Sequence, residues 1–390
     1  MAQKVVIIGG GVIGSAVAYF LLANEPGLSV TVLERDPSYA RSSSALSGSG
    51  IRQQFSTAVA VQMSGFGLEF LRSMPELLDV NGSKPTASLH EGGYLFLAGR
   101  QGADVLRENC AMQNSLGANI AFLDCKGLVE RFPWLNVDDL EAGSYGVSGE
   151  GWFDSYGVLQ ALRKKAQALG ARYFPLEVVA VRRQARRATG VATSSGEEFE
   201  CDTLVNAAGP WARNIAAMLD IDLPVHARRR SIFNVSSPAV LERAPLLIDP
   251  TGVWFRPEGN GYLCGIAPKP ENDHDDLPLH EVDHALFDEI VWPKLAERVP
   301  QFEALRVESC WSGYYEYNVF DQNAIIGYHP DVENCVFANG FSGHGLQHGP
   351  ATGRAVSELI RNGRYTTLDV SSLGWSRVLE NQPIVEKNVV

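Results

Sequence analysis

The segment at residues 4–22, KVVIIGGGVIGSAVAYFLL, constrains the fold of this chain more than any other. It begins as an apolar β-like run, passes through a glycine turn and continues with the apolar spacing of a helix. Gly9, Gly11 and Gly14 match the pattern G-x-G-x-x-G. In that pattern the first glycine allows a tight turn, the second lets backbone approach a pyrophosphate, and the third lets helix pack on strand. Val12 and Ile13 open the helix, whose free N–H groups face the phosphates. We therefore expect a dinucleotide here rather than a purely structural turn.

An acidic residue follows at the distance expected for an acid that binds the ribose. Glu34 ends a second expected strand, SVTVLE, about 20 residues after Gly14. Glu34 and its neighbour Arg35 are therefore candidates for the ribose end of the site. An acid at this position disfavours a 2′-phosphate, which predicts NAD or FAD rather than NADP. The motif does not choose between these two.

A segment rich in serine and glycine, RSSSALSGSGIRQQF at residues 41–55, comes soon after the acid. Small residues let a loop run close to a long cofactor, and hydroxyl groups can bond phosphates. The alternative is a flexible surface linker. A linker would not need Ile51 and Phe55 on either side of Arg52, so we favour a cofactor loop.

Composition excludes some classes of function. The formal net charge of −12 argues against a nucleic-acid or anionic-membrane surface, because phosphate binding needs a concentrated basic face. The six cysteines are scattered without a Cys-x-x-Cys pair, as expected for free thiols in a reducing compartment. The first strand begins within a few residues of the initiator, and the apolar run at 5–22 is broken by glycines. We therefore expect a cytoplasmic protein without a targeting peptide or membrane span.

The order of element types predicts two domains. A chain of 390 residues is long for one core. Its pattern is α/β, then β-rich, then α/β. The expected helices are at 57–78, at 156–170 and near 282–298 within β-rich sequence, with a last helix ended by Gly363. The expected strands include 92–99, 171–183, 190–199 and 203–212. We predict an α/β fold class, with a discontinuous Rossmann-like domain at 1–85, 145–222 and 322–390. A β-rich α+β substrate domain would comprise residues 86–144 and 223–321.

Five motifs together resemble one enzyme family. They are GGGVIG, SGSGIRQQF, NAAGPWA, WSGYYEYNVFDQNAIIG and GFSGHGLQHGPATGRAV. They are similar to the D-amino-acid-oxidase-like family of FAD enzymes, which includes glycine oxidase, sarcosine oxidase and dimethylglycine dehydrogenase. The likeness covers nearly the whole chain. It implies FAD, a flavin-binding domain, and a β-rich substrate domain whose sheet covers the isoalloxazine.

The resemblance also implies which residues hold FAD. The glycine turn would bind the pyrophosphate, and the helix that begins near residue 344 would stabilise negative charge on the reduced flavin. The further cofactor-binding positions are Ser43, Ser44, Ser47, Gly48, Ser49, Gly50, Val178, Ala207, Ala208, Gly209, Trp211, Gly343, His344, Gly345, Leu346 and Gln347.

Four residues are candidates for catalysis. Arg52 matches the family arginine that grips the substrate carboxylate, and a bidentate guanidinium suits this role; the alternative is an ion pair between domains. Tyr315, His344 and Gln347 would shape the amine side of the substrate.

The chain also departs from its family. Gln347 replaces a second carboxylate-binding lysine, and Tyr315 stands where glycine oxidase has its carboxylate arginine. Leu263 replaces a lysine associated with oxygen activation, so the electron acceptor is oxygen or another redox carrier. Tyr314 replaces a cysteine that carries covalent flavin, and Ser47 lies near a histidine attachment point. Noncovalent FAD is therefore expected.

The resemblance implies an oxidoreductase that oxidises the C–N bond of a small amino acid, expected to be N-substituted, such as sarcosine, dimethylglycine, a D-amino acid or an opine. Hydride would pass to flavin N5, and the imine would then hydrolyse. A second hypothesis, motivated by a mitochondrial relative linked to respiratory complex assembly, is a scaffold whose FAD is mainly structural. The sequence leaves both a homo-oligomer and a hetero-oligomer open.

Two clusters invite a metal-site interpretation. His344 and His348 are four residues apart, but their segment holds no acid or cysteine, and its glycines suit close backbone approach. The run at 272–284, NDHDDLPLHEVDH, could bind a divalent ion. A solvated loop in which an acid begins a helix explains it better. We predict no metal site.

Overall fold

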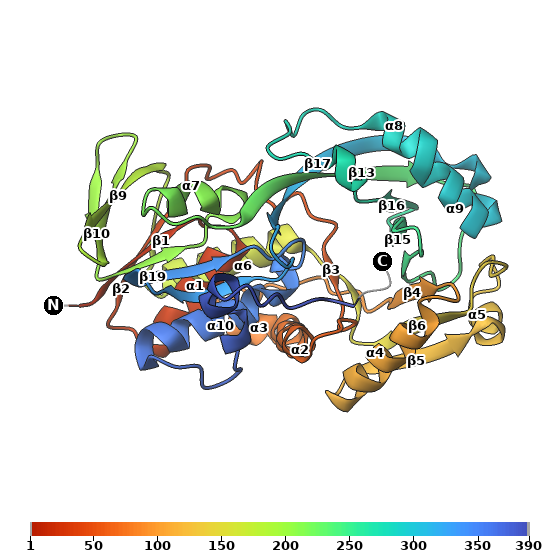
Figure 1. Cartoon of the computed structure of the whole chain (residues 1–390), viewed down its shortest axis with the longest axis horizontal. Helices are drawn as coiled ribbons and strands as arrows, with labels where there is room; N and C mark the ends of the chain where they lie inside the picture. The colour runs from red at the N-terminus through yellow and green to blue at the C-terminus, as the bar shows by residue number, and fades with distance from the viewer. Residues whose placement is uncertain (1, 388–390) are drawn as a thin grey trace.

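The computed structural model describes residues 2–387, which form two lobes that lie side by side (Figure 1). One lobe is built on a largely parallel sheet with helices, and the other on a large, mainly antiparallel sheet. The predicted fold class is confirmed: the chain is an α/β protein with a Rossmann-like part and a β-rich part.

A six-stranded sheet forms the centre of the first lobe, in the order β18-β19-β12-β1-β2-β8. Neighbouring strands are parallel except for β18 and β19. Because both faces of this sheet are covered, the central strands β1, β2 and β12 are mostly buried and rich in apolar residues. The strands are β1 (Lys4–Ile8), β2 (Ser29–Leu33), β8 (Arg172–Phe174), β12 (Thr203–Asn206), β18 (Ile325–His329) and β19 (Val332–Asn339).

The alternation of side chains along β1 assigns the two faces of this sheet. Val5 and Ile7 pack in one core with α1 (Val12–Asn24), α2 (Ala58–Arg72), α3 (Met74–Leu77), α6 (Ser155–Ala168) and α10 (Gly345–Asn362). Val6 and Ile8 pack on the other face. That face is covered by α7 (Ala212–Ala217) and a small sheet of β9 (Val178–Gln184), β10 (Arg187–Thr193) and β11 (Glu198–Glu200).

An eight-stranded sheet forms the second lobe, in the order β17-β13-β16-β15-β14-β4-β6-β5. Its core contains Phe233, Leu247, Phe255 and Phe302, all fully buried. The strands are β4 (Tyr94–Ala98), β5 (Asn119–Asp124), β6 (Ala142–Ser148), β13 (Val225–Ser236), β14 (Leu246–Ile248), β15 (Trp254–Glu258), β16 (Gly261–Gly265) and β17 (Arg306–Asn318); the helices are α4 (Ala103–Ser115), α5 (Cys125–Arg131), α8 (His284–Leu286) and α9 (Trp292–Arg298). A short ladder of β3 (Gly50–Ile51) and β7 (Gly151–Trp152) stands apart from the large sheets.

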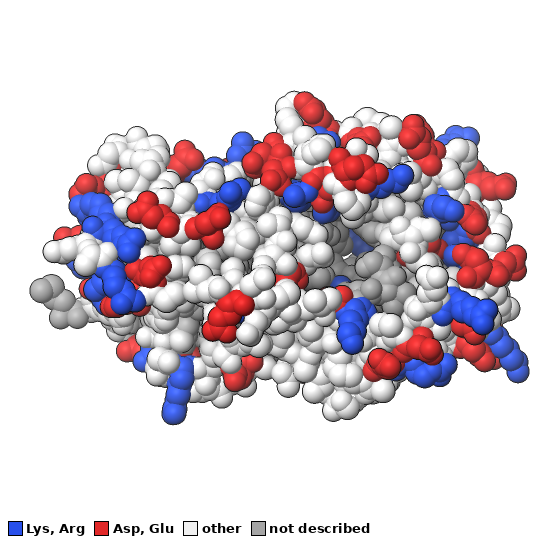
Figure 2. All heavy atoms as spheres, in the orientation of Figure 1, with Lys and Arg blue, Asp and Glu red and all other residues white. Residues whose placement is uncertain are grey.

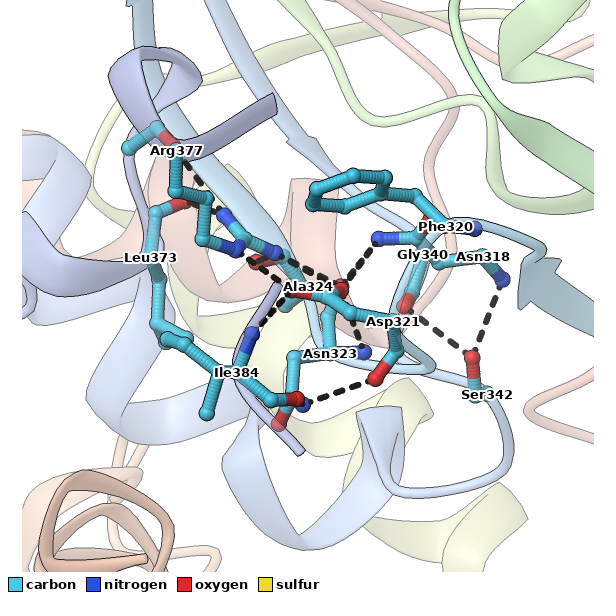
Figure 3. Close-up of polar contacts among 11 residues, drawn as sticks. Asn318, Phe320, Asp321, Asn323, Ala324, Gly340, Ser342, Leu373, Arg377 and Ile384 are labelled. Carbon is cyan, nitrogen blue, oxygen red and sulfur yellow. Dashed lines mark hydrogen bonds and ion pairs between the residues drawn. The ribbon is translucent and has the colours of Figure 1, made fainter. Parts of the chain in front are cut away.

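A buried ion pair fixes the carboxyl-terminal part of the chain (Figure 3). Arg377 on α11 (Trp375–Leu379) donates from Nε to Asp321 Oδ2 at 2.7 Å, and its other nitrogens bond carbonyl oxygens that include that of Ala324. The same carboxylate accepts the N–H of Ile384 at 3.1 Å. Asn318 donates its N–H to Ser342 Oγ at 3.0 Å, which ties this turn to the loop before α10.

Most expected elements are present, and the differences have local causes. The helices near 57–78, 156–170 and 282–298 are confirmed. The helix that Gly363 ends, with a left-handed φ of 66°, is also confirmed, but α11 follows it, so it is not the last helix. The expected strand at 203–212 ends at Asn206, because Gly209 (φ 56°) and Pro210 begin a 3₁₀ turn. The two strands expected at 171–183 and 190–199 are four, β8 to β11, divided by turns.

The strands of the two large sheets can be compared with the predicted domain ranges. Every strand of the six-stranded sheet falls within 1–85, 145–222 or 322–390. Every strand of the eight-stranded sheet falls within 86–144 or 223–321, except that β6 continues to Ser148. The boundaries themselves stay predictions.

Acidic and basic side chains are interspersed over the face shown in Figure 2, so the described residues of this face do not form the concentrated basic surface that nucleic acid requires. Within residues 2–387, no helix is both long enough and apolar enough to cross a bilayer.

Candidate cofactor and substrate site

A cavity of about 1240 Å³ runs between the two lobes and is lined by both. Every cofactor and catalytic candidate predicted from the sequence lines it except Gly14. Residues far apart in the chain therefore meet at one place. Their individual roles stay predictions, which the following contacts support.

The three motif glycines serve different purposes. A Cβ on Gly9 (φ 96°) would lie 2.3 Å from the carbonyl oxygen of Ala207, and one on Gly14 would lie 1.9 Å from that of Gly9. Both are required by close backbone packing. A Cβ on Gly11 would meet nothing nearer than Ser44 Oγ at 3.5 Å, and Gly11 faces the cavity. Its missing side chain leaves backbone open to a ligand.

Glu34 lies at the end of β2 beside this turn. Its carboxylate accepts the N–H groups of Gly10 at 2.8 Å and Asp36 at 2.9 Å. Burial raises its pKa, while these two hydrogen bonds act in the opposite direction. Arg35 stacks on the Trp211 ring with its guanidinium carbon 3.9 Å from the ring centre, and both residues line the cavity.

The serine- and glycine-rich segment lines the cavity wall and is fixed by hydrogen bonds, so the linker interpretation is wrong. Ser44 Oγ accepts the N–H of Val12 at 3.1 Å, at the start of α1. Ser43 Oγ donates to the carbonyl of Tyr314 at 2.6 Å. Ser49, with a positive φ of 62°, donates to a buried hydroxyl of α6 at 2.8 Å.

Arg52 is a buried cation in the cavity wall without an ion-pair partner among the described residues. Its side chain is buried, the residue being 9% exposed, and among residues 2–387 no carboxylate lies within ion-pair distance. Nη1 donates to the carbonyl of Gln54, and the guanidinium packs over the rings of Phe55 and Phe96, 4.1 and 5.1 Å from their centres. The alternative of an ion pair between domains is therefore wrong.

His344 is a neutral partner of this arginine. Arg52 Nη2 lies 2.9 Å from His344 Nε2. Because a guanidinium can only donate, Nε2 accepts and the ring proton is on Nδ1. Burial lowers the pKa of His344 well below its usual value, and the positive charge of Arg52 acts in the same direction. The imidazole is consequently uncharged at neutral pH.

The side chain of Gln347 is hydrogen-bonded to the backbone of Arg52. Its Oε1 accepts the N–H of Arg52 at 2.8 Å and lies 3.4 Å from the hydroxyl of Ser64 on α2. One carboxamide thus joins the start of α10 to the arginine. His348, one residue further, bonds the same hydroxyl at 3.0 Å through Nε2, and burial lowers its pKa to about 3.

Tyr315 stands in the cavity wall with 38% of its surface exposed. Its ring lies against Gly343, where a Cβ would approach to 2.5 Å; Gly343 also has a φ of 99°. The guanidinium carbon of Arg230 lies 5.2 Å from the Tyr315 ring centre. The loop before α10 therefore needs glycine here for two independent reasons.

Sequence reasoning did not single out Tyr94 and Glu316 among the cavity residues, and it left open whether Trp254 faces the flavin or fills the β core. Tyr94 on β4 is buried and lies so close to Gly50 that a Cβ there would approach its hydroxyl to 1.8 Å. Glu316 on β17 is 8% exposed, accepts the N–H of Gly340 at 3.1 Å, and has its pKa raised by burial to about 8. Trp254 lines the cavity while its neighbour Phe255 packs in the core. The strand patterns were visible in the sequence, but the face that each side chain takes was not.

The histidine- and acid-rich run at 272–284 has partners other than a metal. Asp273 pairs bidentately with Arg230 at 2.6 and 3.0 Å, and Asp275 pairs with Arg228. Asp283 caps α8 by accepting the N–H of Leu286 at 3.3 Å, as expected for an acid that begins a helix. No group of side chains suited to a metal ion occurs in the part of the chain that the structure describes.

Comparison with known proteins then identifies the family. The family model described as "FAD dependent oxidoreductase" matches residues 4–359. The chain belongs to this FAD-dependent oxidoreductase family. The family assignment confirms the expected resemblance and the expectations that the protein is an oxidoreductase and that its cofactor is FAD. The open backbone at Gly11, the acid at Glu34 and the volume of the cavity fit this cofactor.

Individual members of the family are similar over nearly the whole chain. FAD-dependent oxidoreductase domain-containing protein 1 of Xenopus laevis is 41% identical over 423 residues, which cover 99% of this chain and 84% of that protein. Glycine oxidase of Geobacillus kaustophilus is 26% identical, covering 96% of each chain. The crystal structure of L-proline dehydrogenase from P. horikoshii has a TM-score of 0.85 and 25% identity, covering 98% of this chain and 99% of that one.

Proposed function

We propose that this protein oxidises the C–N bond of a small amino acid, with N-substituted amino acids the preferred class. The family supplies the redox chemistry, and its similar members include a glycine oxidase and an L-proline dehydrogenase. Both names refer to substrates with a carboxylate beside an amine. A site for this class therefore needs a fixed cation.

One observation carries the proposal, namely the buried guanidinium of Arg52 at the cavity wall without an acidic partner among the described residues. Burying an unpaired charge is costly unless a ligand neutralises it. A carboxylate can accept two parallel hydrogen bonds from a guanidinium, which fixes both position and direction. The preferred ligand of this cavity is therefore an anion of carboxylate shape.

The chain's residues orient the substrate and exclude water. Arg52 holds the carboxylate, and neutral His344 accepts from the guanidinium and keeps it in place. The rings of Phe55 and Phe96 shield the charge from solvent, which strengthens its interaction with an anion. Bound FAD supplies the hydride acceptor. Tyr315 and Gln347 close the amine side, and the imine product hydrolyses in water.

Noncovalent FAD belongs to the same proposal. Tyr314 stands where a related enzyme has the cysteine that carries its flavin, and Ser47 lies near the histidine attachment point of another; neither side chain forms a linkage of the cysteine or histidine kind. Cys310 on β17 packs against the core of the second lobe and is not among the residues that line the cavity. Oxygen or another redox carrier accepts the electrons.

A cytoplasmic location is also proposed. All six cysteines are free thiols, and four of them are buried. Free thiols are typical of a reducing compartment. Fractionation of cells that express the native protein checks this; recovery in an oxidising compartment contradicts it.

Replacement of Arg52 by Met tests the proposal. The FAD-loaded protein is titrated with 2-furoate, an amine-free carboxylate, and binding is followed by the flavin absorption spectrum. The variant should keep FAD and lose roughly tenfold to a hundredfold in affinity, since a hydrogen bond to a charged group contributes about 1.5–3 kcal/mol.

Arg230→Met is the matched control, because Arg230 lines the same cavity but is already paired with Asp273. Its affinity for 2-furoate should fall far less than that of Arg52→Met. Equal affinity in wild type and Arg52→Met would contradict the proposed role of Arg52.

A further inference from the structure

A second buried group that can carry a charge is bonded to the segment that follows Arg52, and it does not line the cavity. Glu150, in the turn between β6 and β7, is 0% exposed and does not line the cavity. Its Oε1 accepts the N–H groups of Gln53 at 2.5 Å and Gln54 at 3.1 Å, the two residues that follow Arg52. Its Oε2 accepts Gln54 Nε2 at 2.7 Å. The carboxyl group is thus bonded directly to the segment that positions the arginine.

Neither group has an ion-pair partner among the described residues. Arg52 has no acid within ion-pair distance, and across residues 2–387 Glu150 likewise has no Lys, Arg or His at that distance. Two buried groups of opposite charge, one on the segment 52–54 and the other hydrogen-bonded to that segment, stabilise each other through a medium of low dielectric. Arg52 lines the cavity, whereas Glu150 does not.

We propose that Glu150 is the buried countercharge of Arg52 in the ligand-free site, and that it takes up one proton when a carboxylate ligand binds to Arg52. This inference rests on the proposed function. The ligand neutralises the guanidinium, which then no longer stabilises the Glu150 anion, so a proton from solvent binds the carboxyl. The net charge of the buried group is the same before and after binding. Glu150 is therefore a positioning residue that links ligand affinity to pH.

The surrounding groups permit this change near neutral pH. Burial raises the pKa of Glu150 to about 7. The hydrogen bonds from Gln54 and Gln53 and the charge of Arg52 lower this pKa, but burial has the larger effect. The other titratable groups that face it are Tyr94 on β4 and Cys110 on α4. Burial raises the pKa of both, that of Cys110 to about 11, so both stay neutral. Arg52 itself is also faced by Tyr315 and by the partly buried Glu386, whose carboxylate accepts hydrogen bonds from Ser56 and Thr57. His344, which contacts Arg52 directly, is neutral throughout this range.

The proposal predicts a specific pH profile for binding. In the FAD-loaded wild type, the affinity for 2-furoate should be constant up to about pH 7, where Glu150 already carries its proton. Above that pH the affinity should fall by up to about tenfold per pH unit, because binding then requires proton uptake. Titration calorimetry in two buffers of different ionisation enthalpy measures the same proton directly.

Glu150→Gln should bind 2-furoate with the wild-type affinity of low pH, and with little dependence on pH. Glu91→Gln is the matched control, because Glu91 accepts the N–H of Gly149 in the same turn at 2.7 Å yet lies at the surface beside Arg72. It should keep the wild-type slope. A flat wild-type profile, or the same slope in Glu150→Gln, would overturn the proposal.

A second measurement does not need a ligand. A double-mutant cycle of Arg52→Met and Glu150→Gln on the free energy of unfolding should show favourable coupling at about pH 8.5 and little at about pH 6. Absence of coupling at both pH values would overturn the inference. Failure of every carboxylate to bind would instead count against the proposed function, and the cycle would still decide the role of Glu150.

Discussion

At the scale of single residues, the cavity is defined by what its glycines and buried charges can accommodate. Gly9 and Gly14 are held by backbone contacts, whereas Gly11 faces open space. Arg52 and Glu150 have no ion-pair partner among the residues described, and Glu316 is another buried acid without one. Substitutions at these positions therefore separate effects on folding from effects on ligand binding.

The two glycines Gly11 and Gly14 form the first such comparison. Gly11→Ala should leave the stability of the FAD-free protein nearly unchanged, because its Cβ meets no protein atom closer than 3.5 Å. It should weaken FAD binding by about tenfold, since the methyl group occupies the backbone surface that a pyrophosphate approaches. Gly14→Ala should instead destabilise the fold by about 1–3 kcal/mol or more, through overpacking against Gly9. Thermal unfolding and FAD titration measure both; a Gly11→Ala variant that unfolds early and keeps its FAD affinity would contradict this.

Glu316 predicts how stability depends on pH. Its folded pKa of about 8 lies above the ordinary value of 4.5, so the folded state binds more protons than the unfolded state between these values. Stability should therefore fall as pH rises through this window, by up to about 1.4 kcal/mol per pH unit for this group. Glu316→Gln should reduce the slope measured by denaturant unfolding at several pH values. An unchanged slope would show that Glu316 ionises as an ordinary carboxyl.

The residue scale also shows where sequence reasoning stops. The glycine motif, Glu34 and Arg52 were found because their spacing or a family motif marks them. Glu150 and Glu316 carry no such mark, since an acid in a strand or turn is ordinarily a surface residue. Their importance arises from burial, which depends on contacts between distant segments such as Gln53 with Glu150.

At the scale of elements, hydrogen bonds from several distant segments hold the start of α10 in place. Gln347 bonds it to the arginine segment, and Glu316 and Asn318 of β17 bond the loop before it. The helix itself was predictable from its apolar spacing and from Gly363. These hydrogen bonds were not predictable, because they join β17, α2 and the segment at 50–54, which are far apart in the sequence. The early end of β12 was missed for a local reason, the positive φ of Gly209.

Substitution of Arg377 tests how much the turn at Asp321, which is bonded to Asn318, contributes to stability. Arg377→Met leaves Asp321 as a buried charge without its partner, in a turn that is also bonded to Asn318 (Figure 3). Removing one partner of a buried pair costs about 3–5 kcal/mol, so the melting temperature should fall clearly. Arg182→Met, which breaks an exposed pair with Glu198, should change it little. Similar melting temperatures for both variants would contradict a large contribution of the Arg377–Asp321 pair to stability.

At the scale of the whole molecule, the site exists only where the two lobes meet. The first lobe contributes the glycine turn, Glu34 and the start of α10, and the second contributes Tyr94, Trp254 and the Tyr315 strand. The sequence predicted this division, because the order of α/β and β-rich segments and the family motifs both indicate it. It could not predict that Arg52 would face the cavity without a counterion, since that depends on how the lobes pack.

The central claim is that this cavity oxidises amino acids. Anaerobic mixing of the FAD-loaded protein with sarcosine, dimethylglycine, proline, D-amino acids and opines tests it most directly, with flavin absorbance as the readout. At least one compound should bleach the wild-type flavin, and the same compound should bleach Arg52→Met far more slowly at equal FAD content. A flavin that dithionite reduces but that no member of the panel bleaches would contradict the claim and favour a scaffold whose FAD is structural.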